Sequence, residues 1–229
     1  MEQIHSGHRE RVRARFFAEG LEHFAPHEVL EFLLYTTIPR GDTNPIAHRL
    51  LDYFGSLTGV FEASYEELLR VDGIGPKSAL LLCSIPALSR VYLTDTQKKG
   101  MILDSAEKMI DFLSPRFLGM REEHFYLVCL DDKRRVLHCQ CLGEGAIDRV
   151  NVDMRRVVDL VMRVSATAVI LAHNHPAQFA VPSNEDIFVT KHIATVLKAI
   201  SVRVLDHFVF SRDDCVSMRE SGYFINLSE

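Results

Sequence analysis

A cluster of metal-binding residue types lies between positions 173 and 186 of the sequence. His173 and His175 are two residues apart, Ser183 follows, and Asp186 comes three residues later. Two neutral imidazoles and one carboxylate suit a divalent cation, and three protein ligands leave a fourth tetrahedral position for water. Zinc there would lower the pKa of that water towards neutrality, and Ser183 would donate a hydrogen bond to a developing oxyanion. The spacing therefore predicts a zinc hydrolase centre.

A buried strand must carry the two histidines to one point. Residues 166–172 form a short apolar run, as expected for a strand inside a sheet, and strand side chains alternate between faces. His173 and His175 therefore project the same way from its C-terminal end. Ser183 is suited to cap the helix that follows, which puts Asp186 in the first turn, near the positive end of the helix dipole.

Each part of this pattern also has an ordinary structural explanation. Ser183 and Asp186 match a plain capping box, and His173 and His175 match two surface histidines beside a turn. The conjunction of the buried run, the two histidines and the capping pattern is much rarer than its parts. The conjunction therefore favours a metal site.

The elements around this cluster predict a sheet domain with helices on its faces. A turn at residues 131–133 joins two of the strands in a hairpin. The mixture of strands and helices indicates an α/β domain built on a mixed sheet, an arrangement also described as α+β. The expected strands cover residues 125–130, 135–142, 202–210 and 216–218, and the expected helices cover residues 105–113, 151–164 and 184–199.

The N-terminal part of the chain is expected to form a small all-α domain. Residues 1–94 carry apolar side chains at helical spacing, interrupted by proline and glycine. Residues 95–104 begin with a polar, turn-rich stretch that is typical of a linker. The sheet domain is then expected to occupy residues 105–229.

A glycine turn in the N-terminal part resembles a helix-hairpin-helix, a motif that binds the backbone of nucleic acids. Gly73 and Gly75 would present backbone N–H groups to a phosphate, and Lys77 would add a charge contact. Such contacts hold DNA without reading its sequence. A tight turn between two helices with no ligand would use the same glycines, and a single hairpin offers few phosphate contacts.

The composition limits the class of protein. The chain has 229 residues and a formal net charge of −5, so strong DNA binding driven by overall charge is not indicated. Its five cysteines are an odd number without the spacing of a disulfide framework, as in reduced cytosolic proteins. The N-terminus begins no apolar run and no segment approaches transmembrane length, which predicts a cytoplasmic protein without a membrane anchor.

The motif from His173 to Asp186 resembles the His-x-His-x7-Ser-x2-Asp signature of JAMM (MPN+) metalloproteases, and more narrowly it resembles the bacterial RadC family. Similar stretches lie at residues 7–11, 38–43, 54–57, 73–75 and 205–207. The resemblance implies a JAB/MPN-type, cytidine-deaminase-like domain preceded by a small helical domain. It further implies zinc bound by His173, His175 and Asp186, hydrolysis of peptide or isopeptide-type bonds, and an association with DNA repair.

Two departures from the RadC pattern bear on catalysis. The family's Ser-Gly after the proline is Ala177-Gln178 here, and a glutamate that commonly follows an arginine in the family is replaced in the pair Arg155-Arg156. JAMM enzymes take their general base from an upstream glutamate. Glu144, at the end of an expected strand, is the candidate, although a glutamate between two glycines is also an ordinary turn residue.

Asp206 and His207 follow the start of a later apolar strand. Either side chain would orient a ligand histidine from behind, as carboxylates and other hydrogen-bonding groups do around many metal sites. Alternatively, the two form an internal hydrogen-bonded pair.

Two functions remain open on the sequence alone. The first is a zinc-dependent hydrolase acting on a peptide or protein substrate, with Ser183 at the oxyanion and Glu144 as the base. The second is a DNA-binding or DNA-repair-associated protein whose metal site is structural or catalytically weak. A metal-dependent nuclease is less well supported, because phosphodiester cleavage commonly uses two clustered metals.

Overall fold

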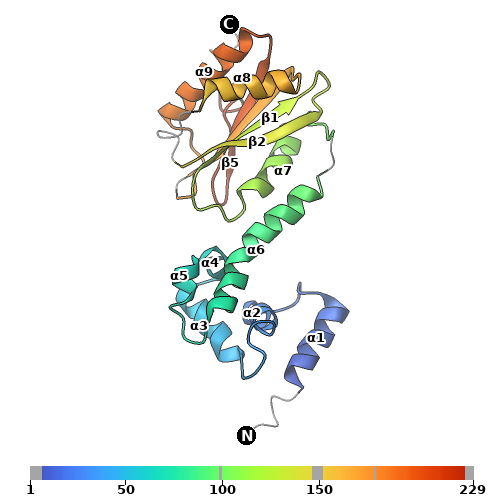
Figure 1. The fold of residues 1–229 in the computed structure, drawn as a ribbon, viewed down its shortest axis with the longest axis vertical. Helices are drawn as coiled ribbons and strands as arrows, with labels where there is room; N and C mark the ends of the chain where they lie inside the picture. Colours follow the sequence, from blue (N-terminus) through green and yellow to red (C-terminus); the bar gives the residue numbers. More distant parts are fainter. Residues whose placement is uncertain (1–6, 98–99, 146–151, 178, 225–229) are drawn as a thin grey trace. The chain divides into compact units, whose positions relative to one another are not determined.

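The computed structural model describes residues 7–97, 100–145, 152–177 and 179–224 (Figure 1). Contacts divide the chain into two compact units, Met1–Ser89 and Arg90–Glu229. The boundary falls inside a helix, α6 (Pro76–Asp95), whereas the sequence suggested a linker at residues 95–104. Two residues of that expected linker, Lys98 and Lys99, lie outside the described residues.

The first unit consists of helices around an apolar core. Leu30, Leu50 and Leu82 from three different helices are fully buried in it. Ser56 and Ser64 accept hydrogen bonds from backbone N–H groups in the first turns that follow them, and so begin two of the helices. The helices before α6 are α1 (His8–Glu19), α2 (Pro26–Leu34), α3 (Asn44–Phe54), α4 (Leu57–Glu62) and α5 (Tyr65–Leu68).

The second unit is built on a five-stranded mixed sheet with the strand order β2-β1-β3-β4-β5. Strand β1 pairs antiparallel with both β2 and β3, β3 pairs parallel with β4, and β5 adds an antiparallel edge. The α/β fold class expected from the sequence is therefore confirmed. The elements are α7 (Ala106–Phe117), β1 (His124–Leu130), β2 (Val136–Glu144), α8 (Met154–Arg163), β3 (Ala168–Asn174), α9 (Asn184–Lys198), β4 (Arg203–Phe210) and β5 (Cys215–Ser217).

Helices cover both faces of this sheet, α8 and α9 on one face and α7 on the other (Figure 1). Strand β3 is buried along its whole length, which explains why its sequence is a continuous apolar run rather than an alternating one. Its side chains still alternate in direction. Val169 and Leu171 pack with α8 and α9, whereas Ala168 and Ile170 pack with α7. By this alternation His173 lies on the face covered by α9.

The parallel connection from β3 through α9 to β4 determines where the first turn of α9 lies. A connection between parallel neighbouring strands must return along the sheet, so the helix begins near the C-terminal end of the first strand. The segment that begins α9 therefore lies close to the end of β3.

Two features that bear on the cellular environment are visible in the described residues. All five cysteines are free thiols, so no disulfide holds either unit together. Among the described helices, none combines the length and the apolar character that crossing a membrane requires.

Truncating the core beneath the histidine strand should destabilise the second unit. Leu171 is fully buried between the sheet and its two covering helices, so we expect Leu171→Ala to lower the free energy of unfolding by about 2–5 kcal/mol. Leu137 on β2 is 41% exposed and provides a matched control, for which Leu137→Ala should cost much less. Denaturant unfolding of the two variants would test this, and equal midpoints would contradict it.

Candidate metal centre

His173 and His175 turn their side chains towards the same point. His173 is the sixth residue of β3, and His175 follows the strand but still donates its backbone N–H to the carbonyl oxygen of Phe210 at 2.7 Å. The pairing of this segment with β4 thus continues one residue past the end of β3. The two Nε2 atoms lie 3.0 Å apart, and both residues are buried. The structure therefore brings these two expected ligands together, as their spacing predicted.

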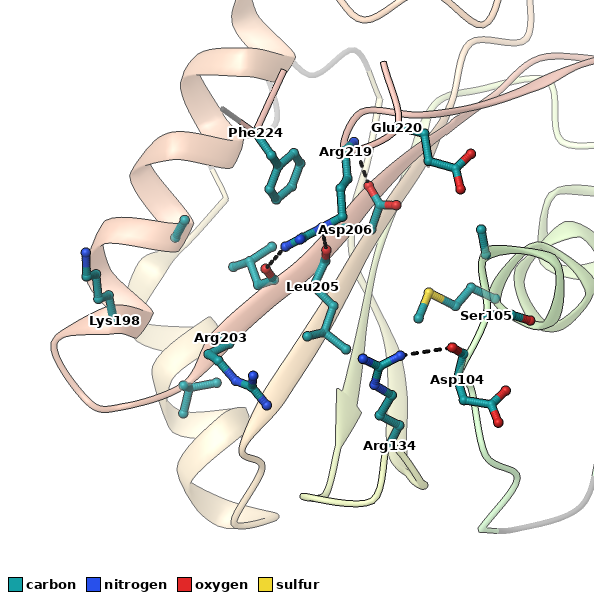
Figure 2. Close-up of a pocket in the computed structure, with 15 residues that line it drawn as sticks. Asp104, Ser105, Arg134, Lys198, Arg203, Leu205, Asp206, Arg219, Glu220 and Phe224 are labelled. Atoms are coloured by element: carbon teal, nitrogen blue, oxygen red, sulfur yellow. Dashed lines mark hydrogen bonds between the residues drawn. The ribbon is translucent and has the colours of Figure 1, made fainter. Parts of the chain in front are cut away.

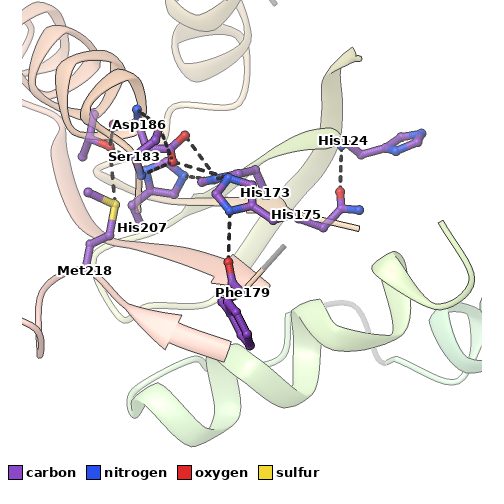
Figure 3. A network of polar contacts seen from close by, with 10 residues as sticks. His124, His173, His175, Phe179, Ser183, Asp186, His207 and Met218 are labelled. Carbon is purple, nitrogen blue, oxygen red and sulfur yellow. Dashed lines mark hydrogen bonds and ion pairs between the residues drawn. The ribbon is translucent and has the colours of Figure 1, made fainter. Parts of the chain in front are cut away.

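Asp186 reaches the same point from the first turn of α9. Ser183 begins the helix, and its backbone N–H and its hydroxyl both donate to Asp186 Oδ2, at 2.7 and 2.8 Å. Asp186 N in turn donates to Ser183 Oγ at 3.1 Å, which completes a capping box. Asp186 Oδ1 lies 3.1 Å from His173 Nε2, and Oδ2 lies 3.5 Å from His175 Nε2 (Figure 3).

The donor set of this triad fits a divalent metal ion. One potential ligand atom from each of His173, His175 and Asp186 lies within 4.8 Å of the other two. Asp186 Oδ1 is fully buried and, within the described part of the chain, accepts no hydrogen bond. A buried carboxylate oxygen without a donor is costly unless a cation faces it. The triad therefore has the composition and the unsatisfied atom of a three-ligand site.

The electrostatic environments of the three triad residues differ. Burial lowers the pKa of His173 below its usual value, which favours the neutral imidazole. Burial also opposes ionisation of Asp186, but the facing imidazoles of His173 and His175 outweigh it and hold the pKa of Asp186 below its usual range. Contact with this carboxylate raises the pKa of His175, which is the less enclosed of the two histidines.

His207 and Asp206 have different surroundings, although they are adjacent. His207 Nε2 lies 2.8 Å from His173 Nδ1, so His207 lies directly behind this ligand, as one of the two expectations held. Burial lowers the pKa of His207 well below its usual value. Asp206 accepts hydrogen bonds from the backbone N–H groups of His207 and Arg219 and from the Ser217 hydroxyl, so the two adjacent residues are also hydrogen-bonded to each other, through the His207 backbone. Asp206 therefore ties β4 to the segment that contains β5.

Glu144, the expected general base, lies at the end of β2. Its side chain is 71% exposed, and its Oε1 lies 3.8 Å from His124 Nε2 on the neighbouring strand. Strand β2 pairs with β1 and not with β3, so Glu144 is separated from the histidine strand by one full strand.

A second glutamate, Glu123, has a more direct relation to the triad. Phe125 pairs with His173 in the antiparallel register of β1 and β3, and continuing that register by two residues places Glu123 opposite His175. Directly opposed residues of an antiparallel pair project on the same face. The charge of Glu123 favours the protonated forms of both histidines. Glu123 also lines a cavity of about 260 Å³ together with His175, Pro176 and Ala177.

Asn174, between the two histidines, holds the segment that carries Glu123. Its side-chain Oδ1 accepts the backbone N–H of His124 at 2.7 Å, and its Nδ2 donates to the carbonyl oxygen of Glu122 at 3.0 Å. The Asn174 amide thus bonds the backbone on both sides of Glu123. Sequence reasoning missed both residues. The available signal was the acidic pair 122–123 immediately before an apolar strand.

The positions at which the sequence departs from the RadC pattern lie close to this site or beside β2. Ala177 lines the cavity next to His175, and Gln178 lies outside the described residues. Arg156 is exposed on α8 and donates from Nη1 to the carbonyl oxygen of Leu142 at 3.3 Å. Arg155, the other arginine of the pair, lies in the first turn of α8.

A second cavity, of about 560 Å³, lies at the start of β4 (Figure 2). Arg134 and Arg219 line it, but both guanidinium groups donate to main-chain oxygens, those of Asp104 and Leu205 respectively. The carboxylates of Asp104 and Glu220 offset part of the positive charge around the cavity. The described residues that line this cavity lie outside the metal triad.

In the first unit, the two glycines of the expected hairpin differ in their surroundings. Gly73 has φ +92°, and a Cβ there would lie 2.9 Å from Ile46 Cδ1, so the fold itself requires a glycine. A Cβ on Gly75 would meet nothing within 4 Å, and Lys77 next to it is exposed. The packing of this unit therefore does not explain why position 75 is a glycine.

Comparison with known proteins identifies relatives for nearly the whole chain. The family model described as a RadC-like JAB domain matches residues 103–223, which include the sheet and the metal triad. The chain is 34% identical over 229 residues to a UPF0758 protein of Fusobacterium nucleatum subsp. nucleatum, and the alignment covers 96% of this chain and 98% of that protein.

Removing the Asn174 amide should loosen the segment that carries Glu123. Asn174→Ala deletes the acceptor for the His124 backbone N–H, so we expect amide hydrogen exchange at residues 122–125 to become roughly 2- to 10-fold faster. Asn184→Ala, at an exposed asparagine of α9, is the control and should leave this segment unchanged. Equal amide exchange at residues 122–125 in the wild type and Asn174→Ala would show that the Asn174 side chain does not hold this segment.

Proposed function

This chain belongs to the RadC family, and from that premise we propose that its C-terminal domain is a zinc-dependent hydrolase of peptide or isopeptide-type bonds. The observation that carries the proposal is the buried convergence of His173, His175 and Asp186, with Asp186 Oδ1 left without a hydrogen bond. Zinc bound by these residues would supply a Lewis acid and activate water for attack on a carbonyl carbon.

We assign the general base to Glu123 in preference to Glu144. A base must come within hydrogen-bond reach of the water whose proton it takes, directly or through one further water. Glu123 lies opposite His175 and shares a cavity with it, whereas Glu144 is mostly exposed beside His124. His175 lines this cavity, so a substrate carbonyl would approach the site there.

Ser183 would act on the oxygen that becomes negative during attack on the carbonyl. A hydroxyl donor preset at a developing oxyanion is a recurrent and effective form of transition-state stabilisation. Ser183 lies at the start of α9, and its hydroxyl contacts Asp186, so it lies next to the triad. The same residue also holds Asp186 in place.

The metal site and the base can be separated by mutation. We expect the full-length protein to bind roughly one zinc ion per chain and His173→Ala to bind none, measured by elemental analysis. Glu123→Gln should retain zinc but lose hydrolysis of a peptide library by about 100- to 10,000-fold. Glu144→Gln is the matched control and should keep both properties.

Each part of this experiment has an outcome that refutes it. A wild-type protein that binds no zinc after refolding with the metal would overturn the metal site. Full activity in Glu123→Gln, with loss in Glu144→Gln, would return the base to Glu144.

We further propose that the reaction takes place in the cytoplasm. The five cysteines are all free, which suits a reducing compartment.

We propose a second function, nonspecific contact with DNA, for the N-terminal unit. It is supported by Gly75, which immediately precedes the twenty-residue helix α6 and has open space where a Cβ would lie, and by the exposed Lys77. A helix start with open space at position 75 and a nearby cation suits a phosphate group. If this proposal alone holds, the metal site is structural or weakly catalytic.

Substitution at Gly75 tests the DNA contact without disturbing the packing. We expect Gly75→Ala and Lys77→Glu to weaken the salt-sensitive binding of duplex DNA several-fold, because the methyl group blocks phosphate approach and the charge is reversed. Lys108→Glu, on the exposed surface of α7, provides the charge control. Fluorescence anisotropy at two salt concentrations measures the effect, and DNA affinity that ignores both changes would exclude the hairpin as the contact.

A further inference from the structure

A chain of hydrogen bonds runs behind the metal triad, from His173 to the helix that carries Asp186. His173 Nδ1 lies 2.8 Å from His207 Nε2, and His207 Nδ1 lies 2.5 Å from Thr190 Oγ1 (Figure 3). Thr190 Oγ1 also lies 2.5 Å from the carbonyl oxygen of Asp186, one helical turn earlier in α9. All four residues of this chain are buried.

The direction of these hydrogen bonds follows from the number of protons available. The Asp186 carbonyl oxygen only accepts, so the single hydroxyl proton of Thr190 must be donated to it. Thr190 Oγ1 then accepts from His207, which places a proton on His207 Nδ1. If the hydroxyl pointed to His207 instead, two oxygen acceptors would face each other at 2.5 Å.

The remaining nitrogen of His207 is then an acceptor. His207 is completely buried, its ring contacts those of His173 and Phe125, and a buried imidazolium is costly unless a carboxylate faces it. A neutral His207 with its proton on Nδ1 has a lone pair on Nε2. This lone pair accepts a hydrogen bond from the N–H on His173 Nδ1, so in a neutral His173 the Nε2 atom carries no proton.

The proton of His175 can be placed by the same reasoning. His175 Nδ1 lies 3.4 Å from the carbonyl oxygen of Phe179, an atom that only accepts, so the proton of His175 belongs on Nδ1. In its neutral form each of these two histidines then leaves Nε2 unprotonated and free to bind a cation beside the Asp186 carboxylate. Three electron-rich atoms that converge in a buried space require a cation between them.

We propose that His207 and Thr190 are positioning residues that hold His173 in the tautomer with a free Nε2, and thereby set the affinity of the site for a divalent metal ion. The inference rests on the proposed metal site and adds the group that prepares one of its ligands. Without this hydrogen-bond relay through His207 and Thr190, the proton of His173 moves to Nε2 and is donated to Asp186 Oδ1, 3.1 Å away. That internal hydrogen bond occupies the two atoms that the metal needs.

Zinc affinity measured by chelator competition tests the relay without a substrate. We expect full-length His207→Phe and Thr190→Val to bind zinc about 10- to 100-fold more weakly than the wild type. His207→Gln should recover much of the affinity, because its amide oxygen can accept from His173 Nδ1. Thr195→Val is the matched control, since Thr195 makes the same hydrogen bond to the carbonyl four residues earlier in α9 but is exposed.

The tautomer of His173 gives a second readout that does not involve metal binding. Long-range proton–nitrogen NMR spectra of the metal-free protein should show His173 protonated on Nδ1, and His207→Phe should shift the proton to Nε2. A wild-type His173 protonated on Nε2, or equal zinc affinity in wild type and His207→Phe, would overturn the relay. Failure of the wild type to bind zinc would instead refute the proposed metal site and leave the tautomer result to stand alone.

Discussion

The burial of one carboxylate is the constraint on which the C-terminal domain depends. Asp186 is fully enclosed, and taking an ionised carboxylate out of water costs several kcal/mol unless its oxygens are satisfied. Ser183 satisfies one oxygen with two hydrogen bonds, and the positive end of the α9 dipole lies nearby. The other oxygen is left facing His173, so the carboxylate is fully stabilised only when a cation joins these groups.

The sheet meets this constraint by joining two kinds of strand pairing at one place. The parallel pair β3–β4 requires α9 as its crossover and brings Asp186 to the histidines. The antiparallel pair β1–β3 ends at Phe125 and His173, and just beyond it Glu123 and His175 line one cavity. A slip of one residue in either register would turn the relevant side chain to the opposite face. The buried apolar side chains along β3 oppose such a slip, so the same residues that stabilise the fold also align the site.

Local patterns could be predicted from the sequence, and contacts that depend on strand pairing could not. The strand before His173 and the cap at Ser183 are confirmed, because apolar runs and capping boxes involve neighbouring residues. Glu123 was missed because its place beside His175 depends on a pairing between segments about fifty residues apart. Glu144 was a candidate base because it lies at the end of an expected strand. The sequence does not show that β1 lies between that strand and the strand of the histidines.

Ser183 has two proposed roles, as the cap of α9 and as a hydrogen-bond donor to an oxyanion. It has only one hydroxyl proton. In the structure that proton is donated to Asp186 Oδ2, in addition to the two capping-box hydrogen bonds, whose donors are the backbone N–H groups of Ser183 and Asp186. To stabilise an oxyanion, the hydroxyl must turn away from Asp186, and the backbone N–H of Ser183 then remains as the donor to Oδ2 at 2.7 Å. Because the backbone bond survives the rotation, Asp186 stays in place while the hydroxyl is released. The capping role and the proposed catalytic role are thus compatible, and the backbone hydrogen bond makes them so.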